Sequence, residues 1–400
     1  MKILHVGPLV FNKSIGYENS AYGYYDLIGA DGPSRVMLSL CDELSKLEGY
    51  DVGILSTKRI NIDNKILPSN VKFLKSYEGW KYRFIINSKK WMKVIEEQFG
   101  VPQIVNFHGV YDIFSVMLAK EMYKKGWPYF VTPHGGLRPV AQNRDRLKKI
   151  VANSIFFNRF ILESKFIHAL TIEEKIDIKK YDNNISDVRL GQSGLPIEFK
   201  KIYLKKPKIK NKVITIGFLG SLFVKIKGID RLLRAILKFQ KTFIKSDLKF
   251  RFIGPLKNAS DQLIIDSYLK QMVKPELLEF LGPKFGKEKW HELQDLDVFI
   301  LPSRTEGMPI VVLEALAYGK PIIVSDGTNM GRFIKDGNCG WHINGSSDSI
   351  YDTLIEIVQT EKSTLKEYGK NAKLYFENQF LMDKSAKDYT KMLDLNDNIE

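Results

Sequence analysis

Short runs of apolar residues alternate along this chain with longer segments whose apolar residues recur at helical spacing. Glycine, proline or aspartate bounds most of the short runs, as expected for buried strands that end in turns. In the first half, the strand candidates are residues 2–6, 51–55, 104–107, 130–132 and 169–171, and the helix candidates are 33–47, 114–125 and 145–165. This alternation predicts an α/β fold with a parallel sheet and helices on both of its faces.

The alternation starts again after a lysine-rich segment, residues 199–211, which has few apolar residues and the composition of a linker. Residues 213–219 are a continuous apolar run, which suits a strand buried on both faces. The later strand candidates are residues 250–254, 278–281, 298–301 and 321–324, and the helix candidates are 229–239 and 364–395. We therefore predict two doubly wound, Rossmann-like domains.

The domain boundaries that we expect follow from these two series. Residues 1–200 form the first domain and residues 201–374 the second, a division that suits a chain of 400 residues. A C-terminal helix at about 375–395 is expected to pack back on the first domain. Parallel sheets of this kind bind ligands at the carboxyl ends of their strands, so a cleft between the two domains is the expected site.

The composition indicates the cellular compartment that we expect for the protein. Two cysteines, Cys41 and Cys339, support neither a disulfide framework nor a metal cluster and fit a reducing compartment. The apolar start of the chain is short and ends at Gly7 and Pro8, which is typical of a first buried strand rather than of a signal peptide. No run of about 18 apolar residues occurs in the sequence. We therefore expect a cytoplasmic protein.

The net charge of +15 points to anionic partners. A sugar nucleotide, a lipid phosphate or an acidic membrane surface would be attracted, and a solvated basic surface explains the charge equally well. No nucleic-acid-binding motif is present, so we expect no nucleic-acid partner. Aromatic and basic residues alternate over residues 80–93, which would suit a lipid-phosphate-linked acceptor and peripheral binding at the inner membrane face.

The most specific motif, LPSRTEGMPIVVLEA at residues 301–315, joins a predicted strand to a predicted helix. Pro309 is expected at the first helical position, its preferred place. The free backbone N–H groups of that helix start would suit an anion or a sugar hydroxyl. Glu306 precedes the helix and Glu314 lies in its second turn, so both can face the cleft. A lone glutamate at either place would be explained by helix capping or by a solvated face.

With the residues that follow it, this motif resembles family 4 of the retaining glycosyltransferases. Glu306 and Glu314 form the Glu-x7-Glu pattern of that family within the context PSxxEGxPxxxxEAxAxGxP, which ends here at Pro321. Residues 336–340, DGNCG, resemble the later DGxxG turn of the family. The resemblance covers essentially the C-terminal half of the chain. It implies the GT-B architecture, in which two Rossmann-like domains face a central cleft.

The resemblance also implies roles for these residues. Glu306 would contact hydroxyls of the transferred sugar close to its reacting carbon, and Glu314 would hold the nucleotide ribose. The other donor-binding residues implied at the helix start are Gly307, Met308, Pro309 and Ile310.

A second motif, residues 217–230, is a strand, a loop and a helix start. Lys227 lies directly before the helix, where a lysine and the helix N-terminus make a diphosphate site for electrostatic reasons. The family places an arginine after the first glycine, Gly220, where this chain has Ser221. Either Lys225 compensates for the missing arginine or the donor phosphates are held more weakly. We assign Lys227 to the leaving diphosphate, and an ordinary surface lysine is the alternative.

In the first half, residues 132–139, TPHGGLRP, follow a predicted strand end and resemble a histidine-containing segment of many family 4 enzymes. The resemblance implies that His134 lies near the sugar or the leaving phosphate. Arg138 could meet a phosphate of the donor or the acceptor. His108, at the end of another predicted strand, is a candidate on the acceptor side.

A long loop over residues 9–31 ends at Gly32, directly before a predicted helix. Loops of this length tend to be functional. Gly32 occupies the place of the family's glycine-rich loop, which lies near the donor phosphates and the acceptor. A surface loop that ends at a helix start explains the pattern equally well.

Asp295 and Asp297 form an Asp-x-Asp motif, which binds metal in the other large glycosyltransferase fold. Here the two acids directly precede a predicted buried strand, and a turn explains them more simply. Lys227 and the helix termini can carry the charge of a diphosphate, so we expect neither a metal nor a cofactor.

The resemblance implies a metal-independent hexosyltransferase that moves a sugar from a nucleotide diphosphate to a glycan or lipid-linked glycan, with retention of configuration. Synthesis of a bacterial cell-surface polysaccharide is the expected setting. The alternatives are a sugar phosphorylase or a sugar-nucleotide epimerase on the same fold, or a catalytically inactive protein that binds a sugar nucleotide.

Overall fold

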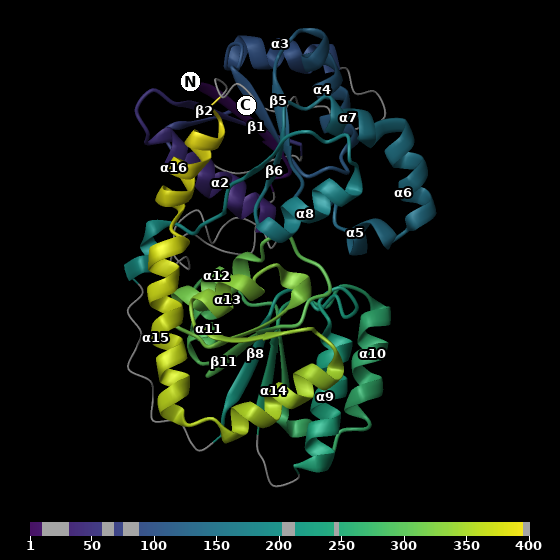
Figure 1. Cartoon of the computed structure of the whole chain (residues 1–400), viewed down its shortest axis with the longest axis vertical. Helices are drawn as coiled ribbons and strands as arrows, with labels where there is room; N and C mark the ends of the chain where they lie inside the picture. Colours follow the sequence, from purple (N-terminus) through teal and green to yellow (C-terminus); the bar gives the residue numbers. More distant parts are fainter. Residues whose placement is uncertain (10–31, 58–67, 75–87, 202–212, 244–247, 395–400) are drawn as a thin grey trace. The chain divides into compact units, whose positions relative to one another are not determined.

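The structure is a computed structural model that describes residues 1–9, 32–57, 68–74, 88–201, 213–243 and 248–394 (Figure 1). The chain forms two compact units. The first consists of Met1–Pro196 together with Met382–Glu400, and the second consists of Ile197–Leu381. The chain thus returns to the first unit at Met382, later than the position of about 375 that the sequence suggested.

The first unit contains a parallel sheet with the strand order β3-β2-β1-β4-β5-β6-β7. Its described strands are β1 (Lys2–Gly7), β2 (Asp51–Ser56), β3 (Val71–Phe73), β4 (Ile104–His108), β5 (Tyr129–Thr132), β6 (Ile167–Ala169) and β7 (Val188–Leu190). Ile3 of β1 lies opposite both Val52 of β2 and Ile104 of β4. The strand order therefore reverses between β1 and β4, and such a reversal opens a ligand site at the carboxyl ends of the strands.

Helices cover both faces of this sheet, because successive residues of a strand point to opposite sides. Ile3 packs against α2 (Gly32–Ser45) and α16 (Met382–Met392), whereas Leu4 belongs to the core on the other face. That second core is formed with α3 (Ser88–Gln98), α4 (Ile113–Lys124), α7 (Asn158–Leu162) and α8 (Ile172–Tyr181). Residues from both ends of the sequence thus build the first unit.

The helix predicted over residues 145–165 is interrupted. The structure has α5 (Pro139–Asn143), α6 (Arg146–Ala152), a π-helical turn η3 (Asn153–Phe157) and then α7. A π turn inserts an extra residue and so rotates the residues that follow it. Phe157 at the end of this turn and Phe160 and Ile161 of α7 face the core, whereas α6 has no buried residue.

The second unit repeats the architecture with the strand order β10-β9-β8-β11-β12-β13, again parallel. Its described strands are β8 (Thr215–Leu219), β9 (Lys249–Ile253), β10 (Leu278–Gly282), β11 (Val298–Leu301), β12 (Ile322–Ser325) and β13 (Gly340–Ile343). The accompanying helices are α9 (Ile229–Thr242), α10 (Ala259–Leu269), α11 (Gly286–Gln294), α12 (Ile310–Ala317), α13 (Gly331–Asp336), α14 (Ser347–Gln359) and α15 (Lys362–Gln379). Here the order reverses between β8 and β11. The two Rossmann-like sheets confirm the predicted fold class.

Three local predictions were wrong. The strand expected at 169–171 is β6, which ends at Ala169, because the Thr171 hydroxyl caps α8 by accepting a hydrogen bond from the Glu174 N–H at 3.1 Å. The helix expected over 364–395 is two helices, α15 and α16, separated by the buried residues Phe380 and Leu381. Pro309 is the N-cap of α12 rather than its first helical residue.

Candidate functional site

In the second unit, the carboxyl ends of β8 and β11 meet where the strand order reverses, and the loops that follow them pack without space for side chains. A Cβ atom on Gly228 would lie 2.0 Å from the Pro302 carbonyl oxygen, and one on Gly327 would lie 2.1 Å from that of Ser303. The Arg304 N–H donates to the Ile226 carbonyl at 2.8 Å. Gly228 therefore lets the loops of the two predicted motifs lie against each other, and Gly327 lets the turn after β12 pack against the loop after β11.

Lys227 and Glu306 form an ion pair between these two loops. The Lys227 Nζ atom lies 2.6 Å from Glu306 Oε1, and the Ser303 hydroxyl donates to the same oxygen at 2.6 Å. The side chains of Lys227 and Glu306 are 20% and 15% exposed, so both remain reachable from solvent. Asn329 donates to the backbone carbonyls of Glu306 and Gly307 at 3.2 and 3.0 Å. The structure thus brings together the two residues that the sequence assigned to donor chemistry.

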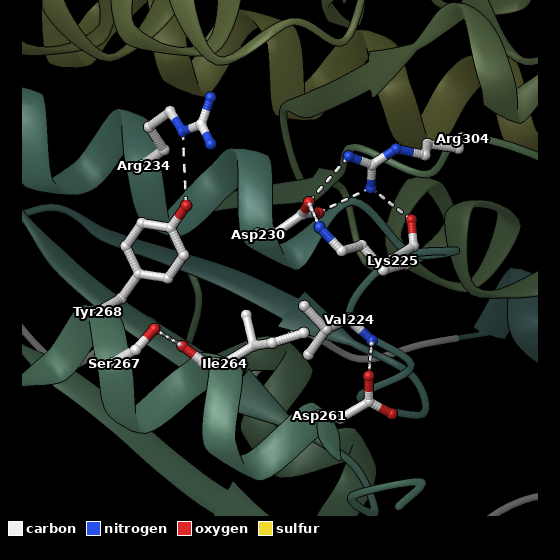
Figure 2. A network of polar contacts seen from close by, with 9 residues as sticks. All are labelled: Val224, Lys225, Asp230, Arg234, Asp261, Ile264, Ser267, Tyr268 and Arg304. Atoms are coloured by element: carbon white, nitrogen blue, oxygen red, sulfur yellow. Dashed lines mark hydrogen bonds and ion pairs between the residues drawn. The ribbon is translucent and has the colours of Figure 1, made fainter.

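A second ion-pair cluster, drawn in Figure 2, also joins the two predicted motifs. Arg304 holds Asp230 with two hydrogen bonds of 2.7 and 2.9 Å, and Lys225 donates to the same carboxylate at 3.0 Å. Burial alone would raise the pKa of Asp230, but the hydrogen bonds from Arg304 and Lys225 outweigh it and hold that pKa below its ordinary value. Arg304 and Asp230 were not predicted to matter, although both lie inside the two motifs. Asp230 is a carboxylate in the first turn of α9, where the helix dipole favours negative charge.

Glu314 lies in the interior of its unit. Its side chain is 1% exposed, and both carboxylate oxygens lie 2.6 Å from the Nζ atom of Lys289, a residue of α11. Lys289 also lies over the Trp290 ring, 4.0 Å from its centroid. The partner was not visible in the sequence, because 25 residues separate Lys289 from Glu314.

The other predicted donor-binding residues lie at the same edge of this sheet. Gly220 adopts a φ of 148°, which a side chain disfavours, and Ser221 is half-buried directly after it. Met308 and Ile310 are each 6% exposed at the start of α12, so their side chains pack inward.

In the first unit, three histidines form a hydrogen-bonded relay. His5 lies on β1, His108 ends β4, and His134 follows β5 in a left-handed conformation with a φ of 51°. His5 Nδ1 lies 2.9 Å from His108 Nε2, and His108 Nδ1 lies 3.0 Å from His134 Nε2. Each pair of rings is stacked with centroids 5.3 Å apart. The predicted candidates His108 and His134 are therefore in direct contact, and His5 was missed.

Burial keeps these histidines neutral. It lowers the pKa of His5 and of His134 to about 3, and the nearby His168 adds to both effects. Burial also lowers the pKa of His108 well below its ordinary value, with further contributions from the surrounding imidazoles. The pKa of His168 falls to about 4, because burial outweighs the hydrogen bond of this histidine to the Gly191 backbone.

Each neutral imidazole carries one proton, on one of its two ring nitrogens. The hydrogen bonds of the relay can therefore all point from His134 toward His5 or all point from His5 toward His134. If His134 donated to His108 and His108 to His5, the His5 Nε2–H would be buried with no partner among the described residues. In the opposite direction His5 Nε2 is a bare acceptor, which is the less costly group to leave unpaired. That direction places the proton of His134 on Nδ1. The relay therefore favours a His134 that offers an N–H donor.

A small pocket adjoins the relay at the carboxyl ends of β4, β5 and β6. Its polar floor includes Thr132 and His168, whose hydroxyl and Nδ1 atoms lie 3.0 Å apart. The lining residues are Val36, Leu40, His108, Thr132, His134, His168, Leu170, Gln192, Ser193, Met382 and Tyr389. Apolar walls around convergent polar groups are typical of sites for small molecules.

Glu174 fixes the turn that carries His134. This carboxylate is 1% exposed and accepts hydrogen bonds from the backbone N–H groups of Gly135 and Leu170 at 2.5 and 2.9 Å. Arg138, which the sequence offered for a phosphate, donates instead to Asp177 at 2.8 Å, and both side chains are mostly buried.

The remaining predicted residues have simpler surroundings. Gly32 is the first residue of α2, but the loop before it, residues 10–31, lies outside the described residues. Asp297 accepts from the Thr215 N–H at 2.8 Å, and Asp295 caps the C-terminus of α11. Within the described ranges, no group of three or more acidic, histidine or cysteine side chains is arranged to hold a metal ion. No helix in these ranges is long and apolar enough to cross a membrane.

Comparison with known proteins gives these sites a context. Residues 199–375 match the family of glycosyl transferases group 1. An uncharacterized glycosyltransferase of Methanocaldococcus jannaschii is 26% identical over 376 residues, which are 92% of this chain and 95% of the relative. The second unit therefore carries a glycosyl transferases group 1 domain.

Solved structures share the whole arrangement of elements. A sucrose-phosphate synthase from Thermosynechococcus elongatus superposes with a TM-score of 0.72 at 14% identity, over 98% of each chain. The Anabaena protein HepE, solved in complex with UDP and glucose, superposes with a TM-score of 0.65 at 14% identity, over 99% of this chain and 100% of that one. At this level of identity the similarity shows the fold, which is GT-B.

Proposed function

We propose that this protein, which carries a glycosyl transferases group 1 domain in a GT-B fold, is a retaining hexosyltransferase that needs no metal. It transfers a sugar from a nucleotide diphosphate to a hydroxyl of a glycan or lipid-linked glycan, in the synthesis of a cell-surface polysaccharide. The observation that carries the proposal is the Lys227–Glu306 pair, 2.6 Å apart at the point where the second sheet reverses its strand order.

The second unit would bind the donor. Transfer breaks the bond between the anomeric carbon and the diphosphate oxygen, and the electron pair departs with that oxygen. The Lys227 ammonium and the first turn of α12 supply positive potential for the departing charge. Glu306 would accept hydrogen bonds from hydroxyls of the sugar, while its contact with Ser303 fixes the direction of its carboxylate. That HepE was solved with UDP and glucose supports a nucleotide sugar as the donor.

Retention follows from attack by the acceptor oxygen on the face from which the diphosphate leaves. The new bond joins that oxygen to the anomeric carbon, and its proton passes to the departing phosphate oxygen. The donor phosphate thus serves as the base, so this route needs no protein nucleophile. In the first unit, His134 would donate its Nδ1 proton in a hydrogen bond to a sugar or phosphate oxygen.

The binding step can be tested with a thermal-shift panel of nucleotide diphosphates and sugar nucleotides in the presence of a chelator. A ligand that binds the folded protein raises its melting temperature with the logarithm of ligand concentration over Kd. We expect one nucleotide to stabilise the protein, and we expect Lys227→Ala to lose that effect. The variant Lys238→Ala is the matched control, because Lys238 forms an exposed ion pair with Asp348 in the same unit.

The chemical step is tested by following the anomeric configuration of the product by NMR. A product with the anomeric configuration of the donor supports the proposal, and inversion would contradict it. Turnover that requires inorganic phosphate and no acceptor would instead identify a phosphorylase. Binding of a nucleotide without turnover, across a panel of acceptors, would identify an inactive binding protein.

A further inference from the structure

The segment that follows the His134 turn exposes an unusual set of apolar side chains. Leu147, Ile150, Val151 and Ile155 are 80%, 54%, 58% and 61% exposed. Their spacing of three, four and eight residues places them along one face of the continuous helical segment formed by α6 and η3. No residue of α6 is buried, so the core of the unit does not explain these side chains. We call this set the apolar stripe.

Cations accompany the apolar stripe. Residues 139–157 contain four basic residues and one acid, Asp145. Arg146 and Lys148 are exposed on α6, and Arg144 is exposed just before this helix. Lys149 lies over the Tyr111 ring, 4.8 Å from its centroid. The segment therefore combines exposed hydrocarbon with a local excess of positive charge.

We infer that α6 and η3 dock the first unit on an anionic lipid bilayer. The apolar stripe would enter the boundary between headgroups and acyl chains, and the flanking cations would meet lipid phosphates. The positive charge of this segment favours an anionic bilayer over a second copy of this chain as the partner. A symmetric contact would place the same basic residues of two copies against each other, which repels, whereas an acidic lipid surface is complementary.

The sequence suggested residues 80–93 as the segment that binds a membrane, whereas the structure favours α6 and η3. Of residues 80–93, those from 88 onward are described and begin α3. Lys89 and Lys93 are exposed there, but the apolar residues Met92, Val94 and Ile95 of α3 face the core. The described part of α3 thus has cations without an exposed apolar face, whereas α6 and η3 carry both.

The test is co-sedimentation of the whole protein, without donor or acceptor, with two kinds of vesicle. One is phosphatidylcholine alone, and the other contains phosphatidylglycerol as one third of its lipid. We expect binding to the acidic vesicles that weakens as salt is added, because screening shortens the reach of the charges. Reversing two charges in Arg146→Glu/Lys148→Glu should lower the partition coefficient by about tenfold or more.

Two pairs of variants separate the contributions. Lys89→Glu/Lys93→Glu makes the same change of charge on α3 and should keep most of the binding. Leu147→Ser/Val151→Ser should weaken binding at unchanged charge, whereas Leu263→Ser, at a residue of the second unit that is 70% exposed, should not. All of these side chains are exposed, so an unchanged melting temperature verifies folding.

Equal recovery with both kinds of vesicle would overturn the inference. So would an equal loss from the α3 and α6 charge reversals, which would mean that net charge alone attracts the protein. A concentration-dependent dimer that Leu147→Ser/Val151→Ser dissolves, without lipid binding, would assign the apolar stripe to a second copy. Because no sugar nucleotide is present, each of these results leaves the proposed transferase activity unaffected.

Discussion

The two units use different chemistry at the same topological position. In both, the polar residues gather at the carboxyl ends of the strands where the strand order reverses. The second unit fills this place with ion pairs, among them Lys227–Glu306 and Arg304–Asp230. The first unit fills it with neutral imidazoles, since burial lowers the pKa of His5 and of His134 to about 3. One site is charged and the other is polar but uncharged.

The difference indicates a division of labour. A diphosphate carries negative charge that must be balanced, and ion-paired lysines and arginines can exchange a carboxylate partner for a phosphate. A sugar hydroxyl needs a hydrogen-bond donor or acceptor of fixed direction. A buried relay of neutral imidazole rings supplies one without burying a charge. Under the proposed function, we therefore expect the second unit to bind the nucleotide diphosphate and the first unit to bind an uncharged part of a substrate. Each of these two expectations can be tested separately.

The largest effect is expected from Glu314→Ala. The substitution removes the carboxylate that lies 2.6 Å from the buried Lys289 ammonium, and breaking a buried ion pair in this way costs about 3–5 kcal/mol. Denaturant unfolding measures the loss. The double variant Glu314→Met/Lys289→Met should recover most of it, because neither charge is then buried. An unchanged free energy of unfolding in Glu314→Ala would show that the pair does not hold the second unit together.

The next effect concerns catalysis. Glu306→Gln keeps a hydrogen-bonding oxygen beside Ser303 but removes the charge that faces Lys227. We expect the transfer rate to fall by about 10²–10³, equivalent to about 2.7–4 kcal/mol of transition-state stabilisation. Initial rates at saturating donor measure it, with Asp348→Asn as the exposed control. Near-full activity of Glu306→Gln would remove this residue from the site.

A smaller effect is expected in the pH dependence of stability, to which the two units should contribute differently. The pKa of His168 is about 4 in the folded protein, whereas an unfolded histidine titrates near about 6.5. Between these values the unfolded chain binds a proton that the folded chain does not, so stability falls as the pH falls. Each such histidine adds about 1.4 kcal/mol per pH unit to the slope. His168→Gln should reduce the slope by about that amount, as measured by unfolding at several pH values.

The same measurement contrasts the second unit with the first. The pKa of Asp230 is also lowered, but a carboxylate titrates in a more acidic range. Asp230→Asn should therefore leave the slope between about pH 4.5 and 6.5 unchanged. If Asp230→Asn changed this slope as much as His168→Gln does, the contrast between a charged and a neutral site would be contradicted.

The smallest effect tests the relay. His5→Phe removes the donor to His108, so His134 loses its preference for carrying the proton on Nδ1. One hydrogen bond is worth about 1 kcal/mol, and kcat/KM should fall by about fivefold to tenfold. His5→Asn should restore most of the activity, because its amide can donate from the place of Nδ1. If both variants lose activity equally and their pH profiles match the parent, His5 serves packing alone.

The sequence predicted the sheets well where strands are buried on both faces. The runs at 104–107 and 298–301 became β4 and β11, since continuous apolar residues leave few alternatives. The strands β3 and β7 were missed. They are three residues long and mix polar with apolar residues, because a strand at the edge of a sheet is covered less completely.

For the sites, spacing predicted the strand ends but not the partners. The family motif located Glu306 and Lys227, and the fold then placed them in contact. Nothing in the local sequence around Glu314 points to Lys289, because helix packing determines which side chains meet. His5 could have been noticed as a histidine within an apolar strand, a position where a polar ring requires a partner. The relay itself needed the strand order to be known.

The return of the chain to the first unit at Met382 has a consequence for how the protein is made. Ribosomes release domains in order, and the amino-terminal domain usually folds first. Here α16 supplies Met382, Ala386 and Tyr389 to the core beneath α2, and these residues are synthesised after the whole second unit. The second unit is contiguous and can finish folding while the first still lacks one wall. During translation, the half that begins the chain is therefore the last to be completed.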